Sequence, residues 1–372
     1  MIYADHAATT KLDIAAFESM KPFLVDDYGN ASQPYSFARP AKKALKLARE
    51  TIAQCINAEP NEIFFTSGGT ESDNWAIKST ALVYGDQGAI ITSQIEHHAV
   101  LNACASIERL GFPVAYLPVD AAGVVQPAYL ESMITPNTKL VSIMYANNEI
   151  GSVQPIKELC SIAHRDGALF HTDAVQALGH LPIDVKDLGI DMLSASAHKF
   201  NGPKGIGFLY IKSGTNLASF MDGGAQEQNR RAGTENVASI VGMASALKKN
   251  CGEMTHNELL LRRLEKCFLD TAESLGLDFI CNGSALRTPG NLSVSFKNAS
   301  GEMLLHRLDL MGICVSTGSA CDSKETQVSH VLQAIKVPHE YIQGTIRISF
   351  GAENTDDDAR RIAECIYEIL QH

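Results

Sequence analysis

Short apolar runs alternate with amphipathic helical patterns from residue 62 to residue 211, and this alternation limits the possible folds more than any other feature. The predicted strands lie at 62–66, 89–92, 139–145, 168–172, 191–196 and 206–211, and the predicted helices among them at 98–110, 127–134, 155–165 and 174–179. Such alternation is typical of βαβ units, in which crossover helices join parallel strands. We therefore expect an α/β fold built on a mainly parallel sheet.

The pattern changes near residue 250, where a smaller unit is predicted to begin. A long amphipathic helix, from about 237 to 275, leads into it. The strands predicted there lie at 278–281, 290–296, 313–316 and 345–350, and the helices at 301–311 and 354–371. A chain of 372 residues is long enough for two domains. We expect a large domain over 13–250 and a small α/β domain over 1–12 and 251–372.

Charge and cysteine content narrow the functional classes. The net charge of −11, from 31 basic and 42 acidic side chains, argues against a nucleic-acid-binding surface or attachment to an acidic membrane. No apolar run approaches the roughly 20 residues of a membrane span, and the first residues show no signal peptide. Nine cysteines without a Cys-x-x-Cys pair fit reduced thiols, and no histidine spacing is typical of zinc. We predict a cytoplasmic protein without a resident metal.

Polar residues follow the predicted strands at the points where the strands end. They are Thr70, the run Glu96-His97-His98, the run Asn147-Asn148-Glu149, Asp173 with Gln176, and Ser196 with His198 and Lys199. In open parallel sheets, ligands bind beyond the carboxyl ends of the strands. Any one of these residues alone is more often a helix cap or a satisfied polar group than a ligand contact. Five such clusters on one predicted edge favour a binding site there.

The turn Ser67-Gly68-Gly69-Thr70 connects the strand 62–66 to a predicted helix through Trp75. A glycine turn between a strand and a helix is a common anion site, because glycine lets the backbone approach and the first N–H groups of a helix attract phosphate. An ordinary connection with Ser67 or Thr70 as the N-cap explains the same residues. From this stretch alone both interpretations stay open.

The run 194–199 places a lysine at the end of a buried strand, just before a turn. Desolvation lowers the pKa of a lysine in such a place and makes its neutral amine a nucleophile, whereas a solvated turn lysine is the simpler alternative. A nucleophilic Lys199 with a phosphate turn, Asp173 and His97 suggests pyridoxal 5′-phosphate. Asp173 would keep the pyridine nitrogen protonated. His97 would stack on the ring and move protons, and Gln176 would bond the ring oxygen.

Six motifs follow one another in an order that resembles a known family. They are Thr66-Ser67-Gly68-Gly69-Thr70-Glu71-Ser72-Asp73-Asn74, Glu96-His97, Asn147-Asn148-Glu149-Ile150-Gly151, His171-Thr172-Asp173-Ala174-Val175-Gln176, Ser196-Ala197-His198-Lys199 and Gly318-Ser319-Ala320-Cys321. Through them the chain resembles the cysteine desulfurases of the iron–sulfur assembly and nitrogen-fixation type, from Tyr3 to about Phe350. The resemblance implies the class V, pyridoxal-phosphate-dependent aminotransferase-like fold, in which a large domain with a mainly parallel sheet is joined to a small α/β domain.

The resemblance also assigns a role to each matching residue. It implies that Lys199 is the Schiff-base lysine, that Asp173 is the pyridinium partner and that His97 is the stacking acid or base. It implies cofactor contacts from Gly69, Thr70, His97, Asn148, Asp173, Gln176, Ser196, His198 and Lys199, with Thr234 reaching the phosphate from the other subunit of a homodimer. Arg347 would bind the substrate carboxylate beside Asn148, because a guanidinium fits a carboxylate with two hydrogen bonds.

Cys321 lies in the small and polar run 316–323, within a loop of about 314–330, and the resemblance makes it the sulfur acceptor. Burial as a free thiol is the commoner fate of a cysteine, but the residues that flank Cys321 are not apolar. The implied reaction converts L-cysteine to L-alanine and leaves a persulfide on Cys321. A sulfur-acceptor protein such as a cluster scaffold would then take the sulfur for iron–sulfur assembly or thiolation.

Other activities stay open at this point. A selenocysteine lyase or a class V aminotransferase would share the fold, although an aminotransferase has no use for Cys321. A remote alternative is an acyl-enzyme hydrolase, because Ser196-Ala197-His198-Lys199 is also a Ser-x-x-Lys motif. Its companion strings would be Ser72-Asp73-Asn74 and Lys212-Ser213-Gly214, but their order along the chain is wrong for that class.

Asp322 stands beside Cys321, where the family commonly has an uncharged residue. A neighbouring carboxylate raises the pKa of a thiol and so reduces the share of attacking thiolate. We predict that Asp322→Thr lowers the pKa of the Cys321 thiol or speeds persulfide formation. The pH–rate profile of the variant checks this, and a profile identical to that of the unmodified chain contradicts it.

Overall fold

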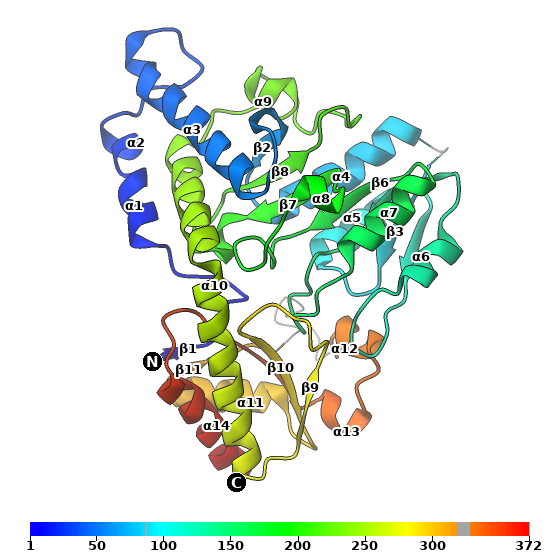
Figure 1. Ribbon diagram of the computed structural model, residues 1–372, viewed down its shortest axis with the longest axis vertical. Coiled ribbons are helices and arrows are strands. Elements are labelled where there is room, and N and C mark those ends of the chain that lie inside the picture. Colours follow the sequence, from blue (N-terminus) through cyan, green and yellow to red (C-terminus); the bar gives the residue numbers. More distant parts are fainter. Residues whose placement is uncertain (86–87, 318–327, 372) are drawn as a thin grey trace.

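A seven-stranded sheet with the strand order β2-β8-β7-β6-β5-β3-β4 forms the centre of the larger part of the molecule (Figure 1). The computed structural model describes residues 1–85, 88–317 and 328–371. The strands are β2 (Ile63–Thr66), β3 (Ala89–Ser93), β4 (Val114–Leu117), β5 (Thr138–Ser142), β6 (Leu169–Asp173), β7 (Met192–Ser196) and β8 (Gly207–Ile211). Only β8 runs antiparallel to its neighbours in this sheet. The predicted α/β fold with a mainly parallel sheet is therefore confirmed.

Helices cover both faces of this sheet. They are α3 (Arg39–Cys55), α4 (Gly69–Tyr84), α5 (His98–Glu108), α6 (Pro127–Met133), α7 (Ile156–Arg165), α8 (Val185–Leu188) and α10 (Val237–Ser274). Successive side chains of a strand point to opposite faces. Phe64 and Leu209 accordingly pack with α4 and α5, whereas Phe65 and Phe208 pack on the side of α3, α7 and the first half of α10. The strands are buried on both sides, which explains their continuous apolar runs.

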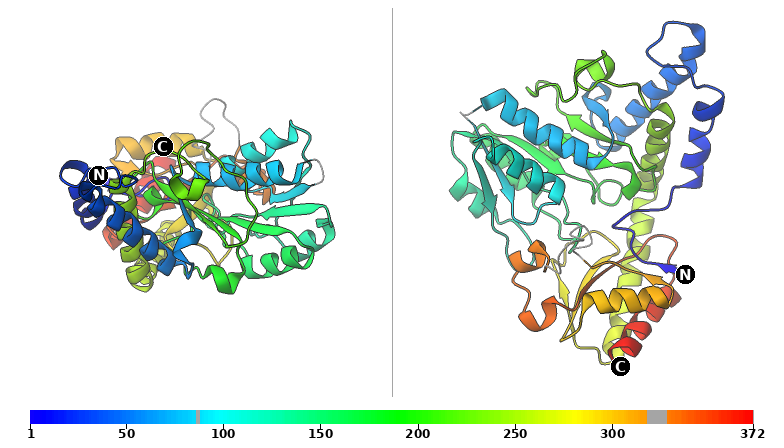
Figure 2. Two further views of the ribbon diagram at one scale, coloured as in Figure 1. Left: turned by 90° about the horizontal axis from the view of Figure 1, so that it is seen from above. Right: turned by 180° about the vertical axis from the view of Figure 1, so that it is seen from behind.

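A three-stranded antiparallel sheet in the order β12-β10-β9 organises the other part of the molecule. Its elements are β9 (Phe279–Asn282), β10 (Asn291–Phe296), β12 (Thr345–Ser349), α11 (Gly301–Leu310), α12 (His330–Ala334), α13 (His339–Ile342) and α14 (Asp356–Leu370). Beside it, β1 (Ile2–Tyr3) pairs in parallel with β11 (Ile313–Cys314), so both chain ends lie in this part (Figure 2). Phe268 of α10 is buried in its apolar cluster. The domain bounds 13–250 and 1–12 with 251–372 stay a prediction.

The N-terminal arm runs between the two parts before α1 (Ile14–Met20) and α2 (Pro22–Val25) begin. The His6 N–H donates to the Ser349 carbonyl at 3.1 Å on the side of the small sheet. The Thr10 N–H and hydroxyl both donate to the His198 carbonyl, at 2.9 and 2.8 Å, on the side of the large sheet. The arm, predicted as extended, is therefore fixed along the edge where β7 ends.

Most predicted elements are confirmed within a few residues, but some differ, and the short helices α8, α12 and α13 were not predicted. No helix forms over 174–179, because Asp173 accepts the Val175 N–H and Gly179 adopts a left-handed φ of 81°, which leaves a series of turns. The short edge strand β4, in which Leu117 is buried and the other residues are partly buried, was not predicted. The predicted loop 212–236 contains the four-residue helix α9 (Gln226–Asn229). No described helix combines the length and apolar character needed to cross a bilayer.

The reversed strand β8 depends on a glycine at its first position. Gly207 pairs with Ser196 on one side and with Thr66 on the other. A Cβ atom at Gly207 would lie 2.7 Å from the Gly68 Cα and also too close to the Ala195 carbonyl oxygen. The absence of a side chain therefore lets the turn after β2 lie directly against β8.

We predict that Gly207→Ala lowers the free energy of unfolding by about 1–3 kcal/mol or more, because the added methyl overpacks a rigid backbone contact. The matched control is Gly252→Ala on the exposed side of α10, where an added Cβ meets nothing within 4 Å. This control should raise stability by up to ~1 kcal/mol, since alanine has the higher helix propensity. Chemical denaturation measures both, and equal effects would contradict the packing argument.

Candidate functional site

A cavity of about 330 Å³ lies where the predicted strand-end clusters meet. Ten of the twelve predicted site residues line it: Gly69, Thr70, His97, Asn148, Asp173, Gln176, Ser196, His198, Lys199 and Arg347. They come from the strand ends of the large sheet and, in the case of Arg347, from β12. The structure therefore brings together residues that are up to 278 positions apart (from Gly69 to Arg347).

The turn before α4 presents backbone rather than side chains to this cavity. Gly68 is the N-cap of α4 at φ 150°, and no side chain caps the helix, so neither Ser67 nor Thr70 is the N-cap. A Cβ at Gly69 would lie 2.5 Å from a methyl of Val175, so only glycine fits. The first N–H groups of a helix lack intrahelical partners and attract anions. With Ser196 beside the turn, these donors form a cradle suited to a phosphate.

Lys199 ends the 3-10 turn (Ala197–Lys199) that follows β7. Its Nζ donates to the carbonyl oxygens of Ala7 and Ala8, at 2.5 and 2.9 Å, and so faces the cavity rather than bulk solvent. The Lys199 carbonyl accepts a hydrogen bond from His180 Nε2 at 2.9 Å. Main chain and side chain are thus both held in place at the cavity, and the role of Lys199 as a nucleophile stays a prediction.

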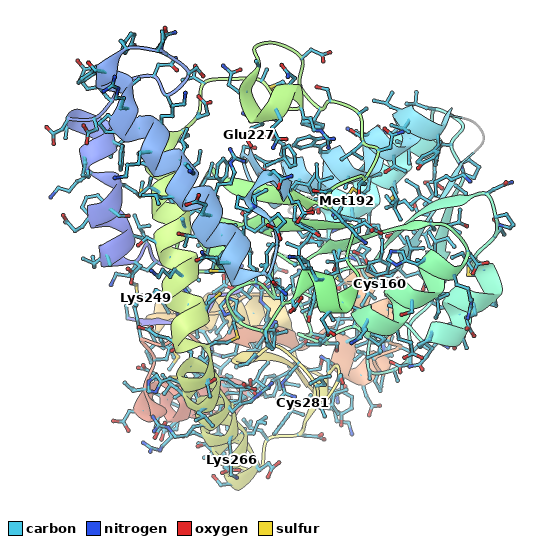
Figure 3. All side chains as sticks on the ribbon, turned by 45° about the horizontal axis from the view of Figure 1, so that its top comes forward. Cys160, Met192, Glu227, Lys249, Lys266 and Cys281 are labelled. Carbon is cyan, nitrogen blue, oxygen red and sulfur yellow. The ribbon has the colours of Figure 1, made fainter. Side chains whose placement is uncertain are left out.

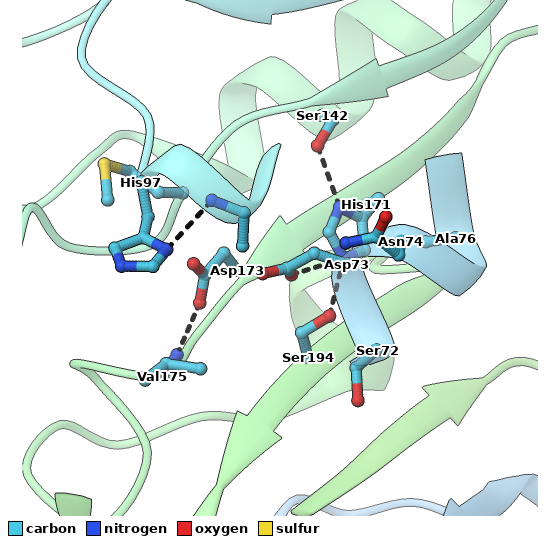
Figure 4. Close-up of polar contacts among 12 residues, drawn as sticks. Ser72, Asp73, Asn74, Ala76, His97, Ser142, His171, Asp173, Val175 and Ser194 are labelled. Carbon is cyan, nitrogen blue, oxygen red and sulfur yellow. Dashed lines mark hydrogen bonds and ion pairs between the residues drawn. The ribbon is translucent and has the colours of Figure 1, made fainter. Parts of the chain in front are cut away.

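Asp173 and His97 lie at adjacent positions in the cavity, and Figure 4 shows Asp173 between His97 and Asp73. Asp173 ends β6, and its Oδ1 accepts the Val175 N–H at 2.9 Å. Burial raises the pKa of the Asp173 carboxyl, and a cation beside it would favour the ionised carboxylate. His97 Nδ1 accepts the Ala99 N–H at 3.1 Å, and burial lowers the pKa of the ring. The neutral ring therefore carries its proton on Nε2.

A buried polar network under the cavity was missed from the sequence. His171 lies between the hydroxyls of Ser142 and Ser194, at 2.8 and 2.9 Å, and its Nε2 is 3.7 Å from Asp73 Oδ1 (Figure 4). Burial lowers the pKa of His171 to about 3. Burial, and then the nearby Asp173, raise the pKa of Asp73 well above its usual value. Both residues belong to motifs of the sequence, but only the folded chain shows that they are buried together.

Glu96 does not line the cavity but connects two segments that flank it. Its carboxyl accepts the Ser93 hydroxyl at 2.6 Å and the Met144 N–H at 3.0 Å, and so ties the end of β3 to the segment after β5. Burial raises the pKa of Glu96 to about 8. Among the residues with described structure, no group of three or more His, Cys, Asp or Glu side chains could hold a metal ion.

Arg347 is buried, although most arginines are exposed. Two of its three guanidinium nitrogens already have hydrogen-bond partners. Nη2 pairs with Asp5 Oδ1 at 2.7 Å, and Nη1 donates to the Asn148 carbonyl at 2.8 Å. Its Nε–H is buried and has no hydrogen-bond partner among the described residues. Asp5 was not predicted as part of the site. Gln176, expected to meet the cofactor ring, donates to the Ala7 carbonyl at 2.9 Å.

One predicted site residue, Thr234, does not line the main cavity. Thr234 lines a second cavity of about 200 Å³, together with Ser67 and Arg231, on another side of the turn before α4. Cys321 lies outside the described residues. The chain on either side of the gap is close to the site, since Ser316 lines the main cavity and His330 Nε2 lies 3.1 Å from the Glu96 carbonyl.

Comparisons with known proteins place the whole chain in one group. The aminotransferase class-V family matches residues 2–362. A cysteine desulfurase IscS of Methanosarcina thermophila is 48% identical over 371 residues, which are 100% of this chain and 92% of the relative. A solved NifS-like protein has a TM-score of 0.94 at 37% identity and covers 100% of this chain and 99% of its own. A structure of SspA in complex with cysteine has a TM-score of 0.85 at 37% identity and covers 95% and 100%.

Glu96 gives a test of the buried carboxyls. Its pKa is about 8 in the folded chain against 4.5 for an ordinary glutamate, so between these pH values the folded chain holds a proton that the unfolded chain has lost. The free energy of unfolding should therefore fall as the pH rises through this window. We predict that Glu96→Gln, which cannot titrate, becomes more stable relative to the unmodified chain at pH 8.5 than at pH 5. Chemical denaturation at both pH values measures this.

The control is Glu258→Gln, at an exposed position of α10, which should show no such change. A stability difference for Glu96→Gln that does not depend on pH would contradict the prediction.

Proposed function

Because this chain belongs to the class V aminotransferase family, and within it to the cysteine desulfurases, we propose that it converts L-cysteine to L-alanine and transfers the sulfur to Cys321 as a persulfide. Members of this family depend on pyridoxal 5′-phosphate. The single observation that carries the proposal is the shared cavity, in which Lys199, Asp173 and Arg347 meet.

The residues of the cavity fit pyridoxal 5′-phosphate. The glycine turn before α4, with Thr70, Ser196 and His198, offers donors to the phosphate. Asp173 offers the ring nitrogen a buried carboxylate that a cation would stabilise, and Lys199 offers the aldehyde its amine. When bound, the cofactor supplies an electron sink for the electrons released at the substrate Cα.

The substrate carboxylate fits Arg347. The unpaired Nε–H of Arg347 is a buried donor, which is costly unless an acceptor reaches it. A carboxylate is the acceptor that suits a guanidinium best, and Asn148 lines the same wall. The solved relative in complex with cysteine supports cysteine as the substrate. Asp5, now on Nη2, holds the guanidinium in place.

Two groups in the cavity can move protons. The Nε2–H of neutral His97 is a donor, because Nδ1 is occupied by the Ala99 N–H. The Lys199 amine, once it no longer holds the cofactor, is an acceptor for the proton on the substrate Cα. A proton donor and a proton acceptor therefore line the same cavity.

Cys321 follows Thr317 by four residues, which is a reach of at most about 14 Å for an extended chain. Because Ser316 lines the cavity, this reach is compatible with attack of the Cys321 thiolate on the substrate sulfur. The carbon–sulfur bond breaks, the electron pair stays with the carbon side, and a sulfur–sulfur bond forms on Cys321. A sulfur-acceptor protein such as a cluster scaffold, in a cytoplasmic setting, would then take the sulfur.

A homodimer completes the proposal. Thr234 lines a cavity other than the main one, so it is available to a second subunit. Large apolar side chains are also exposed together along the N-terminal helices, as a subunit interface requires. They are Ile14, Phe17, Leu24, Val25, Tyr28, Tyr35, Phe37 and Leu47. We propose that Thr234 contacts the cofactor phosphate of the partner subunit.

The rival activities are less well supported. The acyl-enzyme alternative needs Lys212 beside Ser196, but Lys212 follows β8 at the end opposite Gly207, where it pairs with Asp191. Ser72 is also buried, within 2.9 Å of the Thr66 hydroxyl. A class V aminotransferase has no use for Cys321, so this residue favours a cysteine desulfurase over it, and a selenocysteine lyase is the remaining alternative on the same fold.

We predict that one variant loses covalent attachment of the cofactor and that a second variant loses only the sulfur transfer. Lys199→Ala should prevent covalent fixation of the cofactor by borohydride, seen as a missing mass increase. Cys321→Ser should keep that fixation but lose sulfide and alanine production from cysteine, because the acceptor thiol is gone. Cys281→Ser, at an exposed site on β9, is the matched control and should retain both. Alanine and sulfide production that survives in Cys321→Ser would refute the persulfide mechanism.

A further inference from the structure

Two arginine–glutamate pairs fasten the segment 219–236 to the elements around the phosphate turn. The first joins Glu227, which Figure 3 labels at the α9 turn, to Arg49 of α3. The second joins Arg231 to Glu71, in the first turn of α4. Neither pair includes a residue that lines the main cavity. The turn 67–70 connects β2 to α4, so both pairs hold the segment 219–236 close to this turn.

The first pair holds a strained backbone. Glu227, Gln228 and Asn229 have φ values of 45°, 57° and 63°, a left-handed conformation that non-glycine residues seldom adopt. Such a run persists only where its surroundings fix it. The Glu227 carboxylate accepts from Arg49 Nη1 and Nη2, at 2.8 and 2.7 Å, and from the Phe65 N–H at 2.9 Å. The segment is therefore anchored on β2, one residue before the strand ends.

The second pair touches the phosphate turn itself. Arg231 Nε donates to Glu71 Oε1 at 2.8 Å, and Nη2 donates to Oε2 at 3.1 Å. Glu71 Oε2 also accepts the Ser67 N–H at 2.9 Å, so the same carboxylate fixes the turn. The two side chains are 22% and 10% exposed, which limits screening by water. Burial alone would raise the pKa of Glu71, but the hydrogen bonds from Arg231 and Ser67 outweigh it and lower that pKa.

Glu71 presents an electrostatic difficulty for a phosphate site. An ionised carboxylate in the first turn of a helix is favourable for the helix, because it faces the positive end of the dipole. It also stands within about one turn, 5.4 Å along the axis, of the N–H groups that would hold a phosphate, and like charges at such a distance repel. The guanidinium of Arg231 is the positive charge paired with this carboxylate.

We propose that Arg231 is a positioning residue for cofactor binding: it keeps Glu71 on the Ser67 N–H and cancels its charge, so that the turn 67–70 can hold a phosphate. The inference deepens the proposed function and rests on it. Arg231 makes no contact with the phosphate in this arrangement. Because Thr234 is three residues further along the same anchored segment, the pair also fixes the position from which Thr234 would reach a partner subunit.

The test compares Arg231→Met, Glu71→Gln and the double variant. Each full chain is freed of cofactor, and the dissociation constants of inorganic phosphate and of pyridoxal 5′-phosphate are measured by calorimetry. Arg231→Met leaves an uncompensated carboxylate and should weaken phosphate binding about tenfold. Glu71→Gln keeps an acceptor for Ser67 without the charge and should bind phosphate as tightly as the unmodified chain or more tightly. The double variant should return to within about threefold of the unmodified chain.

The opposite signs separate this role from a merely structural one, which would weaken binding in all three variants. Arg165→Met, which breaks an exposed pair with Glu131, is the matched control and should leave both constants unchanged. Unchanged phosphate binding in Arg231→Met, or no recovery in the double variant, overturns the inference and leaves the proposed function intact. An unmodified chain that binds no pyridoxal 5′-phosphate overturns the proposed function and the inference together.

Discussion

The close approach of Gly68 to Gly207 is the contact on which the rest of the site depends. β8 is inserted antiparallel between β7 and β2, so its first residue lies beside the last residues of both. Without a side chain at Gly207, the turn after β2 can lie against this position. The start of α4 and Ser196 then share one edge of the sheet, two strands apart, with Lys199 just beyond. The turn 67–70 and the Lys199 amine, for which we propose phosphate and cofactor contacts, are thus placed by backbone packing.

Hydrophobic pattern was enough to predict this edge, because strand ends are set by where apolar runs stop. Asp173 and Ser196 are the last residues of β6 and β7, and the polar residues after them lie in the cavity as expected. Partners across the fold could not be predicted in the same way. The pair between Arg347 and Asp5 joins positions 342 residues apart, and nothing local in either stretch indicates it. The same holds for the Ala7 carbonyl, which accepts from both Lys199 and Gln176.

Burial of polar groups was the other property that the sequence did not reveal. His171 belongs to one of the six motifs but received no role from the sequence, yet in the folded chain two serine hydroxyls enclose its ring. Asp73 belongs to a motif but received no role from the sequence. In the folded chain it lines the cavity and its Oδ1 lies 3.7 Å from His171 Nε2. Alternation of apolar and polar residues identifies the faces of a strand, but it does not show which polar side chain finds a buried partner. Roles assigned by resemblance alone, such as those of Thr234 and Cys321, stay predictions.

The helix α10 has a mechanical consequence. It is 38 residues long, so it extends for about 57 Å at the α-helical rise. Met243 belongs to the apolar cluster of the large sheet, and Phe268 belongs to that of the small one. If either apolar cluster unfolds, it exposes its own part of α10, while the rest of this helix is still packed in the other cluster. The amide protons in the middle of α10 should therefore exchange with solvent only when both clusters open, which couples the two parts into one cooperative unit.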